Sequence, residues 1–312
     1  MPWKDGYTVS DERSIADSDI GWPKSKTCSF TIVVSLDPQC GPDGLTAADL
    51  KTPEAYYGMH GGLASLRATL DKHRFRATFA ASGALADIHP TILRSLVGDG
   101  HEVAAHGYLR EDVSRLAPSV ESARLQRTTE CVGAATGQRP WGWYSLPRQS
   151  DRYAGGAISA ATMPLLAEHG YKYMGNSLAD DVPHYWVYDP DGPKSILAMP
   201  YYYHFDDQFF LLFPTKGTGL EHADSLARNW RAELAAQYHR GRSFSMVLHP
   251  YAIGWGHRLK LLDAFLGHVA SLSGVWAATA LQCAEHWLVR HPRESSLHLA
   301  PSIWVDHADS LS

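Results

Sequence analysis

Short apolar runs alternate along the chain with longer segments in which apolar residues recur at helical spacing. Residues 29–36, SFTIVVSL, are apolar and β-branched, which is typical of a strand buried on both faces. Residues 54–73 follow with helical spacing, and residues 76–82, RATFAAS, form the next apolar run. This order of strand and helix continues almost to the end of the chain.

We predict strands over residues 29–36, 76–82, 102–106, 141–144, 171–174, 195–200, 243–249 and 275–279. We predict helices over residues 54–73, 90–97, 119–135, 159–169, 223–238 and 281–289, and one more helix on which Leu262, Phe265, Leu266 and Val269 share a face. Such alternation indicates a parallel sheet with crossover helices. Seven or eight units predict a closed or nearly closed α/β barrel. A doubly wound open sheet is the alternative, although the chain lacks its G-x-G-x-x-G turn.

Composition agrees with a globular α/β protein. Of the 312 residues, 45% are hydrophobic and 20% are charged, and barrels of this length often form one domain. We expect a single domain over 1–312, with an N-terminal arm to about residue 27 and an irregular tail from about residue 292. The net charge of −5 argues against nucleic acid or an anionic membrane as a partner.

The four scattered cysteines, together with the lack of an apolar leader or membrane-spanning run, predict a cytoplasmic protein with reduced thiols. Zinc clusters held by cysteine pairs are not expected, because no C-x-x-C motif is present.

Polar side chains stand where several predicted strands end. Asp37 follows strand 29–36, and His106 and His249 end strands 102–106 and 243–249. In α/β barrels the active site lies at the carboxyl ends of the strands. We therefore predict Asp37, His106 and His249 as catalytic residues.

Other strands contribute further polar and aromatic residues to the same rim. The candidates for substrate contact are Arg148, Trp143, Tyr144, Asp181, Tyr201 and Asp207. Each has a structural alternative, because aspartates after strands often form turns or cap helices. His286 and His291, near the C-terminus, are interpreted as solvated surface residues. The G-x-S-x-G elbow, the P-loop and the H-E-x-x-H zinc motif do not occur.

The ordered segments VVSLDPQ, YGMHGG, RATFAASG and GHEVAAHGY resemble the polysaccharide deacetylase superfamily. The later segments RPWGWYSLPRQS, SLADDVPHYW, MPYYYHFDDQFF and VLHPYAIGWGHRLKLLDAFLGHV are similar to its branch of allantoinases, cyclic imidases and cytosolic peptidoglycan-deacetylase-like proteins. The resemblance implies an irregular (β/α)7 barrel, a distorted relative of the TIM barrel, that hydrolyses C–N bonds of a small molecule. It also implies a homo-oligomer, with a tetramer as one option.

The chain departs from this family at one metal-ligand position. Metal-dependent members carry His-x-x-x-His, and both imidazoles join an aspartate on the metal. Here Arg110 stands at the second position after His106, and a guanidinium stays protonated and cannot bind a metal. Glu111 or Asp112 would replace it only if the loop bent inward. The resembling allantoinases also lack the full triad and are taken to work without metal.

We therefore expect no metal cofactor, and zinc held by Asp37 and His106 is the disfavoured alternative. The first functional hypothesis is metal-independent opening of a cyclic amide, imide or ureide ring. Asp37 would orient or deprotonate water, His249 would act as general acid, His106 would hold the water or Asp37, and Arg148 would stabilise the oxyanion. The alternatives are a metal-dependent deacetylase of an N-acylated sugar or peptidoglycan, and a non-catalytic barrel that binds a ligand.

Overall fold

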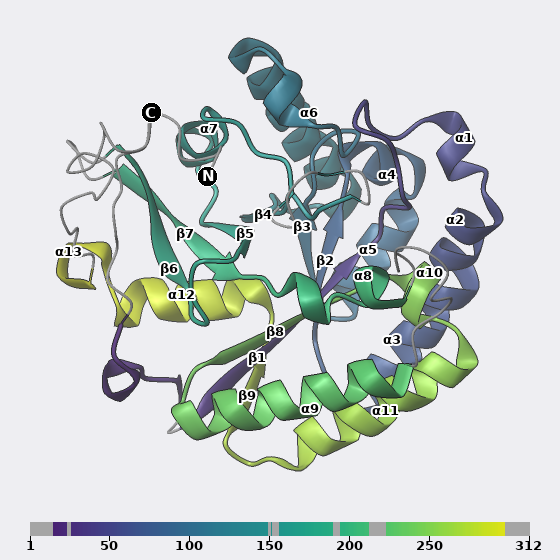
Figure 1. Cartoon of the computed structure of the whole chain (residues 1–312). Coiled ribbons are helices and arrows are strands. Elements are labelled where there is room, and N and C mark those ends of the chain that lie inside the picture. Colours follow the sequence, from purple (N-terminus) through teal and green to yellow (C-terminus); the bar gives the residue numbers. More distant parts are fainter. Residues whose placement is uncertain are drawn as a thin grey trace, which may run out of the picture.

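The computed structural model describes residues 15–23, 26–148, 151, 156–189, 194–211 and 223–296. Its strands form one nine-stranded sheet of order β6-β7-β5-β4-β3-β2-β1-β8, with β9 also paired to β1 (Figure 1). The strands are β1 Cys28–Ser35, β2 Thr78–Ala81, β3 Glu102–Ala105, β4 Gly142–Trp143, β5 Tyr173–Ser177, β6 His184–Asp189, β7 Lys194–Pro200, β8 Ser243–Leu248 and β9 Val275–Ala278. The α-helices are α1 Ala47–Leu50, α2 Pro53–Tyr57, α3 Leu63–Lys72, α4 Gly83–Ile88, α5 Pro90–Gly98, α6 Pro118–Thr136, α7 Thr162–Glu168, α8 Asp207–Leu211, α9 Ala223–Arg240, α10 Pro250–Ile253, α11 Gly256–Ser271, α12 Ala280–Arg290 and α13 Arg293–Ser296.

Seven consecutive neighbours in this sheet run parallel: β8, β1, β2, β3, β4, β5 and β7. Only β6, at the edge, is antiparallel to its neighbour. The expected irregular (β/α)7 barrel of the polysaccharide deacetylase type is confirmed. Its irregularity is visible at β1, whose first half pairs with β9 and whose last residues pair with β2.

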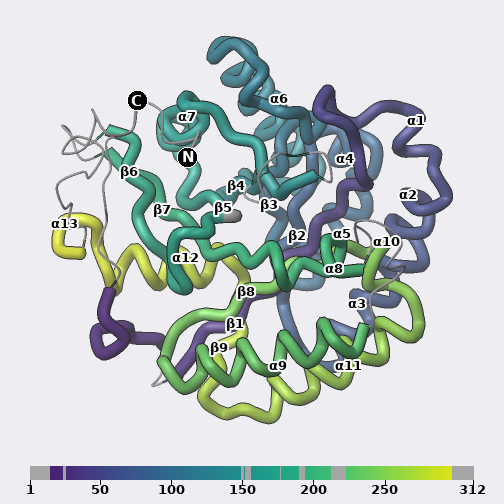
Figure 2. The backbone as a smooth tube through the Cα atoms, viewed as in Figure 1, coloured from purple at the N-terminus to yellow at the C-terminus, as the bar shows by residue number. Residues whose placement is uncertain are grey.

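The two faces of the sheet have different neighbours because strand side chains alternate between faces. Phe30 and Ile32 point outward from β1 into a core shared with Phe265 of α11. Val33 points inward, in a cluster with Tyr173. Helices α9 and α11 lie side by side over the outer face, as the tube in Figure 2 shows. Each such buried apolar side chain contributes about 1.5–3 kcal/mol.

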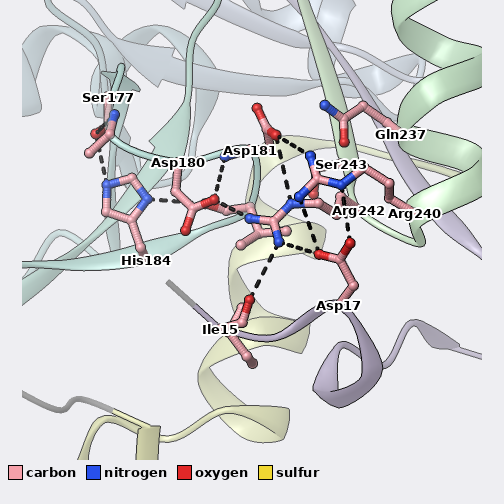
Figure 3. A network of polar contacts seen from close by, with 12 residues as sticks. Ile15, Asp17, Ser177, Asp180, Asp181, His184, Gln237, Arg240, Arg242 and Ser243 are labelled. Atoms are coloured by element: carbon pink, nitrogen blue, oxygen red, sulfur yellow. Dashed lines mark hydrogen bonds and ion pairs between the residues drawn. The ribbon is translucent and has the colours of Figure 1, made fainter. Parts of the chain in front are cut away.

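The barrel has a seam between β7 and β8, where the described residues form no ladder. The loop after β5 fills this seam: the Ser243 N–H donates to the Asp181 carbonyl at 3.2 Å, and the Tyr202 hydroxyl donates to the Asp181 carboxylate at 3.2 Å. Arg242, 3% exposed, pairs with Asp180 and, at 2.6 Å, with Asp17 of the N-terminal segment (Figure 3). These contacts tie three separate segments to the start of β8.

Several elements differ from the sequence prediction. The expected helix 54–73 contains a π-helical turn, Gly58–Gly62. Position 62 requires glycine, because a Cβ there would lie 2.3 Å from the Pro250 carbonyl oxygen. Helix α4 and strand β6 were not expected, since both are short or only partly apolar. The tail expected to be irregular from residue 292 begins with helix α13.

The interpretation of His291 as solvated is wrong: it is 6% exposed and packs on Trp287, with ring centroids 4.3 Å apart. His286 is half-buried and contacts the Gly21 carbonyl oxygen through Nε2 at 2.7 Å. Among the described residues no helix is long and apolar enough to cross a membrane.

Candidate active site

Asp37 and His106 meet at the carboxyl ends of β1 and β3. Both side chains are buried, and His106 Nδ1 lies 2.8 Å from Asp37 Oδ2. The same oxygen accepts the Ser82 N–H at 3.1 Å. The Leu146 N–H donates to His106 Nε2 at 3.1 Å, so the ring proton resides on Nδ1 and is donated to Asp37. Burial lowers the pKa of His106, which keeps the imidazole neutral.

His249 follows β8 and is held by Asp207, the first residue of α8. The Asp207 carboxylate accepts the His249 backbone N–H at 2.9 and 3.1 Å and receives Nδ1–H at 2.8 Å. Both residues are fully buried. Burial lowers the pKa of His249 to about 4, so the imidazole is neutral and Nε2 carries a lone pair at neutral pH.

Asp37 Oδ1 and His249 Nε2 are among the buried acceptors of this region that have no hydrogen-bond partner within the described residues. The Asp37 charge raises, and the Arg110 charge lowers, the pKa of His249, so these groups lie in one electrostatic environment. Buried polar atoms without partners are rare in folded proteins and mark places where a ligand or water binds. The structure therefore brings Asp37, His106 and His249 to one end of the barrel.

Asp206 lies beside Asp207 and His249. Its carboxylate accepts the Tyr201 hydroxyl at 2.9 Å and the Gln208 N–H at 2.9 Å, and its Oδ1 lies 3.6 Å from His249 Nδ1. Burial raises the pKa of Asp206 to about 6. Burial also raises the pKa of Asp207.

Asp206, Asp207 and His249 form a candidate metal group, because one potential ligand atom from each lies within 4.8 Å of the others. The hydrogen bonds of this group instead suit a His249 imidazole that is protonated at Nδ1 and oriented by the Asp207 carboxylate. A metal at Nδ1 would require that proton to leave.

The metal arrangement of the resembling family does not fit Asp37 and His106. His106 Nε2 is occupied by the Leu146 N–H, and Nδ1 faces Asp37. Arg110, at the second histidine position, donates from Nη1 to the Pro38 carbonyl and from Nη2 to the Pro147 carbonyl, each at 3.0 Å. One open carboxylate oxygen, Asp37 Oδ1, is too small a donor set for a catalytic metal.

A polar group that the sequence analysis missed adjoins the site. Gln39 Nε2 donates to Gln208 Oε1 and, at 2.7 Å, to the Tyr251 hydroxyl. Gln208 Nε2 donates at 3.2 Å to the Pro147 carbonyl, which also receives Arg110. Gln39 Oε1 is buried and has no partner among the described residues. Gln39 stands two residues after Asp37, and this closeness in sequence was the one signal available.

The predicted substrate contacts have other partners. The Arg148 guanidinium binds Asp151 Oδ1 at 2.7 and 2.9 Å and the Arg110 carbonyl at 2.7 Å, so it braces a loop. Asp181 pairs with Arg240 at 3.0 Å in the seam described above (Figure 3). Asp207 orients His249.

The aromatic candidates are largely core residues. Trp143 packs edge-on to Tyr171, Tyr144 packs edge-on to Tyr173, and the Tyr201 hydroxyl is bound to Asp206. Trp143 and Tyr144 also line a cavity beside His106 and Arg110. The core thus holds these three side chains, and two of them border this cavity.

Comparison with known proteins agrees with the fold. Residues 57–174 match the family model described as polysaccharide deacetylase. The peptidoglycan deacetylase of Helicobacter pylori is 24% identical over 259 residues, which are 75% of this chain and 86% of that protein.

Solved structures give the same picture. A Mycobacterium smegmatis crystal structure named as a polysaccharide deacetylase is 28% identical, with a TM-score of 0.75 over 88% of this chain and 94% of that one. PuuE allantoinase is 22% identical and superposes with a TM-score of 0.75 over 90% of this chain and 95% of its own.

Proposed function

We propose that this chain, of which residues 57–174 match the polysaccharide deacetylase model, is a hydrolase of that superfamily. It would hydrolyse a C–N bond by opening a cyclic amide, imide or ureide ring. The observation that carries the proposal is the pair of buried acceptors, Asp37 Oδ1 and His249 Nε2, that have no partner among the described residues. The other polar atom of each side chain has a partner: His106 binds Asp37 Oδ2, and Asp207 binds His249 Nδ1.

In the proposed reaction a water molecule binds between these two acceptors. Asp37 Oδ1 orients the water, and His249 Nε2 takes one of its protons while the water oxygen bonds to the substrate carbonyl carbon. The ring C–N bond then breaks, and the imidazolium of His249 delivers the proton to the leaving nitrogen. The products are a carboxylic acid, which loses its proton to solvent, and an amide or urea nitrogen that carries the transferred proton.

His249 thus serves first as base and then as acid, which refines its expected role as general acid. The lowered pKa supports the first step, because the resting imidazole is unprotonated at neutral pH. Asp207 holds Nδ1–H and stabilises the imidazolium that forms.

Ring opening suits this site better than removal of an acetyl group. An imide nitrogen that bears a second carbonyl is a much better leaving group than a simple amide nitrogen, so less Lewis-acid assistance is needed. The Asp37–His106 pair lacks the open nitrogen that a metal would use. Similarity to PuuE allantoinase, a ureide hydrolase by its name, supports the same choice.

The names of other relatives support the deacetylase alternative. The deciding experiment measures turnover of succinimide, hydantoin, dihydrouracil and allantoin beside N-acetylglucosamine oligomers, with and without a chelator. Ring opening that survives the chelator supports the proposal. Chelator-sensitive release of acetate with no ring opening refutes it. The homo-oligomeric state and the cytoplasmic location expected from the sequence remain predictions.

A further inference from the structure

Arg110 is a buried guanidinium without a carboxylate partner among the described residues. It is 4% exposed, and its hydrogen bonds go to two carbonyl oxygens, those of Pro38 and Pro147. Its Nε–H is buried and has no hydrogen-bond partner in the part of the chain that the structure describes. By contrast, the buried Arg148 is paired with Asp151. A buried guanidinium without a directly paired carboxylate is costly, and its open Nε–H can donate to an oxygen that carries negative charge.

The chain holds this guanidinium in place by several contacts. Arg110 has φ of +59°, a left-handed conformation that is uncommon for a residue with a side chain. Its carbonyl accepts Arg148 Nη1 at 2.7 Å, and Asp151 fixes Arg148 in turn. A strained backbone persists only where surrounding contacts over-determine it, and such positions cluster at functional sites.

Arg110 binds the loops that carry Asp37 and the Leu146 N–H. Pro38 follows Asp37, and Pro147 follows Leu146, whose N–H binds His106. The positive charge of Arg110 lowers the pKa of both His106 and His249. The guanidinium therefore lies between the loops after β1 and β4, within the field of the site.

We propose that Arg110 is a catalytic residue whose positive charge takes the place of the metal that metal-dependent members of the superfamily use, with Nε–H donating to the substrate carbonyl oxygen. This inference rests on the proposed function. When the water oxygen bonds to carbon, the carbonyl π electrons move to oxygen, and Arg110 stabilises that oxyanion until the C–N bond breaks. Arg148, which the sequence analysis assigned to this role, is a positioning residue that holds Arg110.

The test compares Arg110→Gln and Arg110→Lys with Arg115→Gln, an exposed arginine of the same loop that pairs with Asp43. Arg110→Gln is expected to lower kcat about 10²–10³-fold with little change in KM, the usual scale for losing an oxyanion donor. The acid limb of its pH–rate profile should move to higher pH, because the variant lacks the Arg110 charge that lowers the pKa of His249. Arg110→Lys should restore that limb but only part of the rate. Folded Arg110→Gln with near wild-type kcat overturns the inference.

A second readout separates this inference from the ring-opening proposal. Succinamate, the carboxylate formed from succinimide, should raise the Tm of the wild type and of Arg115→Gln but not that of Arg110→Gln. If Arg110→Gln does not fold, Arg110→Lys replaces it, and succinamate should raise its Tm less than that of the wild type. No shift in the wild type, or an equal shift in the Arg110 variants, contradicts the assignment. If the wild type removes only acetyl groups, the ring-opening proposal fails, while the same variants still decide the role of Arg110 in that reaction.

Discussion

The backbone N–H of Leu146 donates to His106 Nε2 at 3.1 Å. This contact fixes the tautomer of His106 and uses the nitrogen that would otherwise point to a metal. In the proposed mechanism His106 therefore supports Asp37, which its Nδ1 contacts. The same loop presents Pro147 to Arg110.

The purified protein is therefore expected to contain no stoichiometric transition metal, and chelators should leave its activity unchanged. Elemental analysis and assays after dialysis against dipicolinate measure this. A content of about one zinc per chain, with activity that is lost on chelation and regained with zinc, would contradict the prediction. The Asp206–Asp207–His249 group would then be the first place to look for the metal.

Asp37→Asn and His249→Ala should each reduce turnover at least about a hundredfold, because each removes a positioned proton acceptor. His106→Ala should be damaging to a lesser degree, since water can replace part of its support of Asp37. His204→Gln is a suitable control, because His204 follows β7 but is exposed. Near-normal kcat in either of the first two variants would remove that residue from the mechanism.

The pH dependence of kcat/KM should report the buried imidazole. Since the pKa of His249 is lowered from 6.5 to about 4, its unprotonated form persists well below neutral pH. Activity should stay level as pH falls from neutrality and decline only near pH 4, as protonation removes the base. Circular dichroism at each pH controls for unfolding. An acid limb centred near pH 6.5 would show that His249 titrates like an exposed histidine or does not act as the base.

Asp207→Asn should lower kcat at least about tenfold while KM changes little. The carboxylate both orients Nδ1–H and stabilises the imidazolium, and an amide can do only the first. Steady-state kinetics on the best substrate measure the effect. If KM rises while kcat is unchanged, Asp207 contacts substrate, as the sequence analysis expected.

Arg242→Ala should destabilise the fold by about 2 kcal/mol or more, because it leaves Asp180 without its buried partner at the barrel seam. The neighbouring Arg240→Ala is the matched control, since Arg240 is 44% exposed and its ion pairs are worth less than about 1 kcal/mol. Urea unfolding of both variants gives the comparison. Equal destabilisation would mean that burial at Arg242 adds nothing.

Local pattern was sufficient for most of the fold. Runs such as 29–36 and 243–249 are short and mostly apolar, and this composition suits strands buried on both faces. The rule that barrel sites lie at carboxyl ends of strands then selected Asp37, His106 and His249. Local pattern did not show the close approach of Gly62 to Pro250, which lies far away in sequence.

The sequence by itself thus determined the order of strands and helices and the polar residues at the strand ends, because both follow from neighbours along the chain. Only the tertiary structure distinguished two arginines near the site by their partners. Arg110 and Arg148 have the same chemistry, yet Asp151 neutralises one and two carbonyls hold the other. The hydrogen-bond partners of an arginine depend on how separate loops pack, and the pattern of hydrophobic residues does not predict that packing.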